Sequence, residues 1–308
     1  MTQFNVPIAF IVFNRPGTTI RVFEEIRRIK PRKLLVVADG PRANRLGDAD
    51  KCAQVRAIVE QVDWTCEVLR NYAVSNMGCK KRVSSGLEWV FEQVEEAVIL
   101  EDDCLPHPTF FLFCEQLLER YRDDERVGII SGDNFLFGEQ LMADSYYFSR
   151  YSHIWGWATW RRTWQSYDVD MKQWPVLKKS GWLNNILHDN KMVTYWTHIF
   201  DAVYYNKIKT WDYQLVFSNM LNSKLNIMPN RNLVSNIGFG NEATLTTEIS
   251  EFSEMPVSEM KFPLVHPDVM MRNAIADGIS ERDQFTFLPI YVRMKNFIRY
   301  LIRKIIQK

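Results

Sequence analysis

Three acidic residues, Glu101, Asp102 and Asp103, directly follow the apolar residues 97–100. A short continuous apolar run is typical of a strand buried on both faces of an α/β sheet. Adjacent carboxylates repel one another unless a cation or solvent relieves them, and open α/β sheets bind ligands beyond the carboxyl ends of their strands. Taken alone, the stretch predicts either a divalent-metal site at a sheet edge or an acidic turn exposed to solvent.

Two earlier apolar runs also end in polar residues. Residues 6–13 are followed by Asn14 and Arg15, and residues 33–38 are followed by Asp39. The carboxyl ends of parallel strands lie along one edge of a sheet, so we expect these side chains to converge on the acidic triplet. Arg15 and Asp39 also suit ordinary surface turns, and their residue types do not decide between the two interpretations.

Strands and helices alternate along the first 135 residues, which predicts an α/β fold with a mostly parallel sheet flanked by helices. The expected strands are residues 6–13, 33–38, 65–69, 97–101 and 127–131, and the expected helices are residues 18–29, 48–62, 79–94 and 109–120. Past residue 146 the alternation fades. The later expected elements are helices 189–206 and 213–221, a short strand 225–228, and a polar loop 233–246 of the kind that often closes over a ligand.

The composition narrows the classes of protein. The formal net charge of +1 over 308 residues gives no nucleic-acid signature. Five cysteines without C-x-x-C spacing suggest neither a disulfide framework nor a zinc site, so we expect a reduced, cytoplasmic protein. The dinucleotide fingerprint G-x-G-x-x-G and the P-loop are both missing.

The segment 287–308 is a predicted basic amphipathic helix. It carries six Lys or Arg residues and no acid, and its apolar residues share one helical face. Such a helix can lie on an anionic membrane surface, which would place the protein peripherally on the inner face of the cytoplasmic membrane. It can equally pack on the domain or on a second subunit, as in a homodimer.

Taken together, these residues resemble the glycosyltransferases of the GT-A fold. The chain is most similar to a widespread bacterial group of nucleotide-sugar transferases from surface-polysaccharide clusters. It is more distantly similar to the inverting N-acetylglucosaminyltransferase I family. The resemblance covers residues 6–245 and rests on the strand with Asn14 and Arg15, the strand ending in Asp39, and the motifs VILEDDCLPHPTFF, VGIISGDN, WGWATW and Trp211-Asp212.

The resemblance implies a Rossmann-like GT-A domain over residues 1–265 and a tail, 266–308. The nucleotide-binding half would reach about residue 135, and the acceptor half would follow it. The implied reaction is inverting transfer of a hexosyl or N-acetylhexosaminyl group from a nucleotide-diphosphate sugar, expected to be UDP-linked. The acceptor would be a hydroxyl of a surface glycan, for which a lipid-linked glycan is one expectation.

The resemblance also assigns roles to residues. Asp103 would ligate Mn²⁺ or Mg²⁺ between the donor phosphates, since both ions favour carboxylate oxygens. Glu101 and Asp102 would contact the ribose or sugar. Asn14 and Arg15 would approach the phosphate or base, and Asp39 would accept a hydrogen bond from the base.

Asp212 would be the general base that removes the proton of the acceptor hydroxyl. It also suits the N-cap of the following helix. Asp133 competes for the role of base because it too follows a strand. His107 and His266 are further candidates for metal ligands.

Several other functions stay open: a retaining glycosyltransferase, a sugar nucleotidyltransferase, a phosphohydrolase and a non-catalytic glycan-binding module. A nucleotidyltransferase usually carries a Gly/Arg/Lys-rich loop after its first strand, and residues 15–17 are too short for it. A phosphohydrolase usually has a second Asp two residues after the first, where this chain has Pro41. A glycan-binding module could use the Trp-rich region 155–211 but does not need converging acids.

Overall fold

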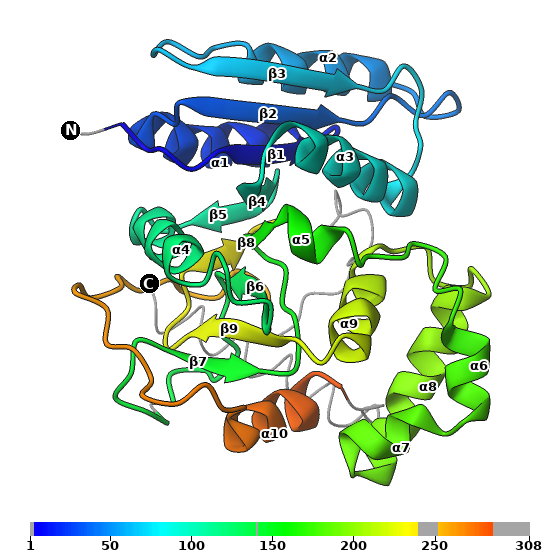
Figure 1. Cartoon of the computed structure of the whole chain (residues 1–308). Coiled ribbons are helices and arrows are strands. Elements are labelled where there is room, and N and C mark those ends of the chain that lie inside the picture. Colours follow the sequence, from blue (N-terminus) through cyan, green and yellow to red (C-terminus); the bar gives the residue numbers. More distant parts are fainter. Residues whose placement is uncertain (1–2, 140, 240–251, 286–308) are drawn as a thin grey trace, which may run out of the picture.

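The structure is a computed structural model that describes residues 3–139, 141–239 and 252–285 (Figure 1). One eight-stranded sheet runs through the molecule in the order β3-β2-β1-β4-β8-β6-β9-β7, and a small sheet pairs β5 with β10. The strands are β1 Ile8–Val12, β2 Lys33–Ala38, β3 Glu67–Tyr72, β4 Glu96–Glu101, β5 Cys104–Pro106, β6 Val127–Ser131, β7 Tyr146–Ser149, β8 Trp157–Trp160, β9 Leu225–Pro229 and β10 Val234–Asn236.

The helices of the described residues are α1 Pro16–Ile29, α2 Asp48–Val59, α3 Cys79–Gln93, α4 Thr109–Arg120, α5 Arg161–Trp164, α6 Trp174–Lys179, α7 Trp182–Leu187, α8 Asn190–Tyr204, α9 Asp212–Leu221 and α10 Ala274–Asp283. Some of them cover the two faces of the sheet, α6 to α9 pack against one another, and α10 lies against the edge strand β7. Among them, no helix is both long and apolar enough to cross a bilayer.

The first half of the sheet is parallel. Strands β3, β2, β1 and β4 pair side by side in the same direction, and β6 pairs parallel with β9. Strand β8 runs antiparallel between β4 and β6, and β7 runs antiparallel along the edge. The predicted α/β class with a mostly parallel sheet is therefore confirmed.

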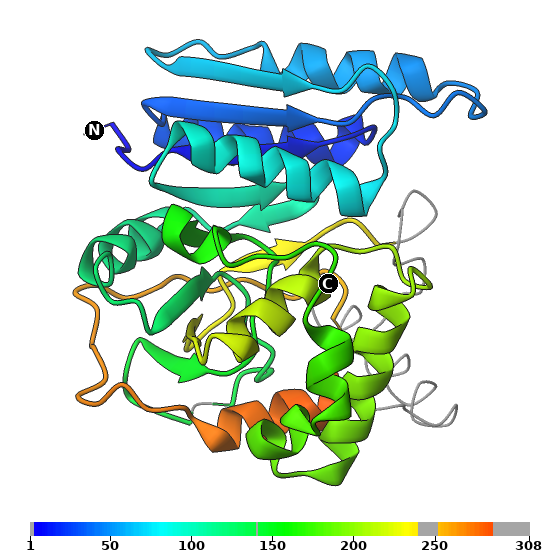
Figure 2. The same cartoon turned by 45° about the vertical axis from the view of Figure 1, so that its right-hand side comes forward.

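Side-chain alternation along the parallel strands builds a core on each face of the sheet. In β1, Ile8 and Phe10 pack with α1, α2 and α4, whereas Ala9 and Ile11 pack with α3. Figure 2 shows α3 on one side of the strands and α1 and α2 on the other. Burial on both faces explains why these strands lack polar alternation.

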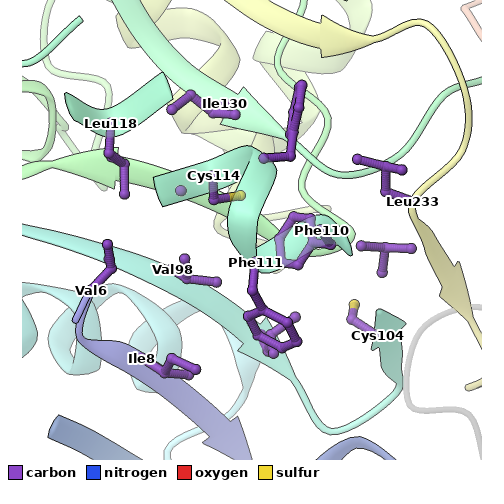
Figure 3. Packing of buried hydrophobic residues seen from close by; sticks show 14 of the residues in the cluster. Val6, Ile8, Val98, Cys104, Phe110, Phe111, Cys114, Leu118, Ile130 and Leu233 are labelled. Atoms are coloured by element: carbon purple, nitrogen blue, oxygen red, sulfur yellow. The ribbon is translucent and has the colours of Figure 1, made fainter. Parts of the chain in front are cut away.

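The first core also fixes the residues just beyond β4. Phe110 and Phe111 of α4 pack beside Cys104 of β5 and Leu233, which leads into β10 (Figure 3). All four side chains are buried. The turn that carries Asp102 and Asp103 thus joins a strand in the central sheet to a strand packed against this core.

The structure differs from the expected elements in the second half of the chain. The Trp-rich motif WGWATW contains β8, which the sequence does not predict as a strand because both of its faces are buried and aromatic. In the first half, the edge strand β3 begins two residues and ends three residues later than expected, and its side chains are partly exposed. Of the expected loop 233–246, residues 240–246 lie outside the described residues.

The expected tail helix 287–308 also lies outside the described residues, so its membrane or subunit contact stays a prediction. The described part of segment 266–308 contains α10, which the sequence does not predict. Asp277 of α10 accepts a hydrogen bond from Ser149 of β7 and pairs with Arg272. This helix therefore packs on the edge of the sheet.

Candidate functional site

A cavity of about 240 Å³ lies where the carboxyl ends of β1, β2 and β4 face the starts of α3 and α9. The sequence predicts seven site residues, and six of them line this cavity: Arg15, Asp39, Glu101, Asp102, Asp103 and Asp212. Parallel strands bring the first five together, and the start of α9 adds Asp212 from the second half of the chain. Their convergence is a finding about position, and their roles remain predictions.

Asn14, the seventh predicted residue, is not among the residues that line the cavity. Its Nδ2 donates a hydrogen bond of 2.6 Å to Asp48 Oδ1, at the start of α2. Asp48 also accepts two hydrogen bonds from the Arg42 guanidinium, and this contact holds the pKa of Asp48 well below its usual range. Asn14 therefore ties β1 to α2, and its approach to the nucleotide stays a prediction.

Arg15 bridges the last two acids of the triplet. Its Nη1 lies 2.7 Å from Asp103 Oδ2, and its Nη2 pairs with Asp102 Oδ1. Asp102 Oδ2 also accepts a hydrogen bond of 3.0 Å from the Phe13 backbone. Burial lowers the pKa of Arg15, but attraction to the two carboxylates outweighs it, and the net pKa is raised. Arg15 is thus a permanent cation locked between two acids.

The buried carboxyl groups carry raised proton affinities. Burial, together with repulsion from Asp103, raises the pKa of Glu101 to about 8 despite the attraction of Arg15. Burial and Asp103 also raise the pKa of Asp102. Burial is again the main cause that raises the pKa of Asp212. Negative charge is therefore in excess at this end of the sheet, and a bound cation would relieve it.

The lining residues fit a hard divalent cation. Five carboxylates and three guanidinium groups line the cavity, and carboxylate oxygens suit Mg²⁺ and Mn²⁺. In the described part of the chain, no three Asp, Glu, His or Cys residues are grouped as a complete metal site. A metal would therefore be held by one or two carboxylates, and substrate and water oxygens would complete its coordination shell. Asp103 is the better candidate ligand of the last two acids, because its side chain is more exposed than that of Asp102.

Asp39 already has four hydrogen-bond donors within the protein. Oδ1 accepts from the backbone N–H groups of Gly40 and Met77, and Oδ2 accepts from Asn76 Nδ2 and the Gly78 backbone. A carboxylate offers about four acceptor positions, so these contacts fill it. Asp39 therefore holds the start of α3 against the end of β2. The predicted hydrogen bond from the nucleobase would have to displace one of these four bonds or share its acceptor oxygen.

Asp212 is the first residue of α9, and Trp211 is its N-cap residue. Thr210 Oγ1 donates a hydrogen bond to Asp212 Oδ1, and Tyr167 Oη donates to the Trp211 carbonyl at 3.0 Å. The Trp211 side chain makes no N-cap hydrogen bond. Burial is the main cause that raises the pKa of the Cys79 thiol, and the next largest causes are the charges of Glu101, Asp212 and Asp103. These three acids therefore lie around the start of α3.

Two further residues of the cavity are not anticipated from the sequence. A Cβ on Gly238 would lie 2.6 Å from Arg15 Nη1 and 2.7 Å from Asp103 Cβ, closer than real Cβ contacts. The segment is held there because β10 pairs with β5 and the Ile237 N–H donates to the Asp103 carbonyl at 2.8 Å. Any larger residue here would force the ion pair or the segment itself to shift. The predicted closing loop contains this residue, but spacing alone could not single it out.

Arg82 of α3 is the second such residue. Its side chain is 4% exposed, its Nη2 donates to the carbonyl and Oδ1 of Asn71, and its Nε has no partner among the described residues. Burial lowers the pKa of Arg82, with only a distant attraction to Asp39 opposing it. An arginine with no carboxylate in contact is costly inside a protein, which suggests that its partner is a ligand.

The remaining candidates lie away from the cavity. His107 Nδ1 is 2.8 Å from Thr109 Oγ1 at the start of α4, and His266 Nδ1 is 2.9 Å from Tyr146 Oη. Neither histidine lines the cavity. Asp133 is fully buried behind its wall and is not a lining residue either.

No protein-family model matches this chain, and no curated protein matches it significantly. Among solved structures, it is similar to a cytidylyltransferase from Leptospira borgpetersenii (9% identity, TM-score 0.32, covering 54% of this chain and 64% of that one). It is also similar to a UDP-glucose pyrophosphorylase complexed with UDP-glucose (10% identity, TM-score 0.28, covering 48% and 64%). A third is a 4-diphosphocytidyl-2C-methyl-D-erythritol synthase from Anaerococcus prevotii (12% identity, TM-score 0.29, covering 70% and 96%).

The chain therefore spans less than two thirds of the length of the first two proteins. The first two names are those of nucleotidyltransferases, a class that the sequence leaves open as an alternative. At these TM-scores the likeness assigns neither a family nor an activity to this chain. The finer resemblance to N-acetylglucosaminyltransferase I is not supported by these matches and stays a prediction.

Proposed function

We propose that this chain is a metal-dependent glycosyltransferase that moves a sugar from a nucleotide-diphosphate sugar to a glycan hydroxyl with inversion. The proposal rests above all on one observation. Asp103, paired with Arg15 at the end of the parallel strands, and Asp212, at the start of α9, line the same small cavity. In this proposal Asp103 serves the donor diphosphate and Asp212 serves the acceptor hydroxyl.

In this proposal Asp103 holds Mn²⁺ or Mg²⁺, which would supply Lewis-acid stabilisation of the departing diphosphate when bound. Arg15 would share its guanidinium donors between Asp102, Asp103 and the phosphate oxygens, for which its planar fork is suited. Glu101 and Asp102 shape the surroundings of Asp103 and contact the ribose or sugar. The ion pairs of Arg15 offset part of the negative charge of Asp102 and Asp103.

Asp212 accepts the proton of the attacking hydroxyl. A carboxylate can do so because bond formation acidifies the hydroxyl in the transition state, and general-base contributions are typically about 10²- to 10⁴-fold. The raised pKa of Asp212 brings its proton affinity closer to that task. Thr210 and the first turn of α9 hold the carboxylate in place.

The nucleobase is proposed to lie at the β2–β3 end of the cavity, near Arg82. Strand β3 is three positions from β4 in the sheet, a separation of about 14 Å at about 4.8 Å per strand. If the diphosphate lies at Asp103, the nucleoside must extend toward β3, where the Arg82 guanidinium is bound to Asn71. An arginine donor there suits the carbonyl oxygens of uracil, which agrees with a UDP-linked donor.

A sugar nucleotidyltransferase is the second candidate. Against it, only three residues separate the end of β1 at Val12 from the start of α1 at Pro16. This leaves no room for the long Gly/Arg/Lys-rich loop expected after the first strand of such enzymes. The products separate the two candidates, because a nucleotidyltransferase releases pyrophosphate and a glycosyltransferase releases the nucleoside diphosphate.

The experiment is thermal stabilisation by UDP with Mn²⁺, measured for the wild type and for Asp103→Asn. A ligand at 100 times its Kd stabilises the native state by about 2.7 kcal/mol, and the variant should lose most of that gain. Asp50→Asn, at an exposed position of α2, is the matched control and should behave as wild type. Equal stabilisation of Asp103→Asn and wild type would refute the role of Asp103, and no stabilisation of the wild type would refute the proposed donor class.

A further inference from the structure

The hydroxyl of Ser131, the last residue of β6, has two oxygen neighbours at hydrogen-bond distance. Its Oγ lies 2.7 Å from Asp133 Oδ1 and 2.6 Å from the carbonyl oxygen of His153. A serine hydroxyl has one proton to donate, and a backbone carbonyl can only accept. If Asp133 is ionised, Ser131 must share its one proton between the two acceptors in a bifurcated hydrogen bond. If Asp133 is protonated, it can donate to Ser131, and Ser131 can donate to His153, so that each short contact is a full hydrogen bond.

The other surroundings of Asp133 agree with a neutral carboxylic acid. The residue is 1% exposed, and Oδ2 accepts a hydrogen bond of 3.2 Å from the Trp155 backbone. Its ionisable neighbours in the described chain are Tyr147 of β7 and His153, and no Lys or Arg of the described residues pairs with it. Burial raises the pKa of Asp133 to about 7, and burial lowers the pKa of His153 to about 3, so the imidazole adds no cation.

Asp133 therefore connects the end of β6 with the segment that leads from β7 to β8. That segment contributes Ile154 and Trp155 to the wall of the candidate cavity. The Trp155 ring meets the Phe239 ring edge to face, with centroids 5.8 Å apart. Phe239 follows Gly238, which abuts the pair of Arg15 and Asp103. The contacts run without a break from the carboxyl group to the ion pair.

We propose that Asp133 is held as a neutral carboxylic acid whose hydrogen-bond relay through Ser131 positions the Trp155 wall of the cavity. It is a positioning residue and not the base. Its consequence for catalysis rests on the proposed glycosyltransferase function, whereas its protonation does not. Once Asp133 ionises, Ser131 has a single proton to share between two acceptors. The relay is then weaker, and the segment that carries Trp155 is less firmly held.

The first experiment measures the melting temperature of wild type, Asp133→Asn and Asp133→Ala between pH 5 and pH 8. In the wild type the native state retains a proton that the unfolded chain has lost, so this group makes stability fall as pH rises from about 4 to about 7. An amide donates to Ser131 and accepts from Trp155 without ionising. Asp133→Asn should therefore keep the fold and lose that part of the pH dependence.

Other buried acids contribute to the same slope, so the readout is the difference between wild type and Asp133→Asn. An unchanged slope in Asp133→Asn would overturn the proposal. The proposal would also be overturned if Asp133→Asn were as destabilised at pH 5 as Asp133→Ala. In that case the amide would have failed to replace a neutral carboxylic acid. If Asp133→Ala does not fold, Ser131→Ala supplies the comparison, since it removes the relay and leaves the carboxyl group in place.

The second experiment separates positioning from base catalysis. Mn²⁺-dependent UDP binding should weaken above about pH 7 in the wild type more than in Asp133→Asn, because the relay weakens there only in the wild type. Hydrolysis of the nucleotide-sugar donor should be retained by Asp133→Asn. A loss of about 10²-fold or more at all pH values would assign Asp133 as the base and overturn the proposal. If wild type binds no UDP, the proposed function fails, while the melting experiment still decides the protonation.

Discussion

The most demanding prediction concerns Gly238→Ala. The added Cβ would lie 2.7 Å from Asp103 Cβ and 2.6 Å from Arg15 Nη1, and nearer still to the Asp103 carboxylate. Ordinary contact begins at 3.4 Å, so Asp103 or the segment of Gly238 must move by about 0.7 Å or more. The move is not cheap, because Asp103 is held by Arg15 and its carbonyl by the Ile237 N–H.

We expect the substitution to act mainly on ligand binding and catalysis. Overpacking costs typically about 1–3 kcal/mol of stability, and a displacement of about 1 Å at a positioning group can cost about 10²-fold in rate. The assay is Mn²⁺-dependent UDP binding by calorimetry, followed by donor hydrolysis. Both should fall, with hydrolysis reduced about 10²-fold.

Gly278→Ala is the matched control for Gly238→Ala. Gly278 lies in α10, and a Cβ there meets no atom within 4 Å. Alanine at that position should stabilise the helix by about 0.5–1 kcal/mol and leave binding unchanged. If Gly238→Ala bound UDP and Mn²⁺ like the wild type, the tight apposition of Gly238 and the Asp103–Arg15 pair would not matter for function, and the reasoning would be wrong.

Two further predictions concern the two ends of the cavity. Arg82→Gln should weaken UDP binding about 10- to 100-fold, as expected for hydrogen bonds from a charged group, while Mn²⁺-pyrophosphate binding stays the same; equal losses for both ligands would place Arg82 at the phosphates. Asp212→Asn should keep UDP binding but reduce transfer about 10²- to 10⁴-fold. Because burial raises the pKa of Asp212 and the base must be ionised, the wild-type transfer rate should rise with pH above the usual titration range of Asp; a flat profile over that range would move the base elsewhere.

Most elements of the first half of the chain are predictable from local pattern. Residues 33–38, 109–120 and 127–131 form elements at the predicted bounds, because continuous apolar runs and helical periodicity are local signals. The second half is harder. Strand β8 is antiparallel within a largely parallel sheet and carries Trp157 and Trp160 on its two buried faces, so neither alternation nor a turn signal marks it.

The sequence alone determined that acids would gather at one sheet edge, because polar residues follow successive parallel strands. It could not determine what each side chain contacts there. Asn14 turns to Asp48 and Asp39 is filled by the start of α3, whereas Arg82 and Gly238 enter the cavity from segments without a motif. These outcomes depend on contacts between residues far apart in the sequence, from 34 positions for Asn14 and Asp48 to 223 positions for Arg15 and Gly238. No local pattern encodes such contacts, and only the packed tertiary structure decides them.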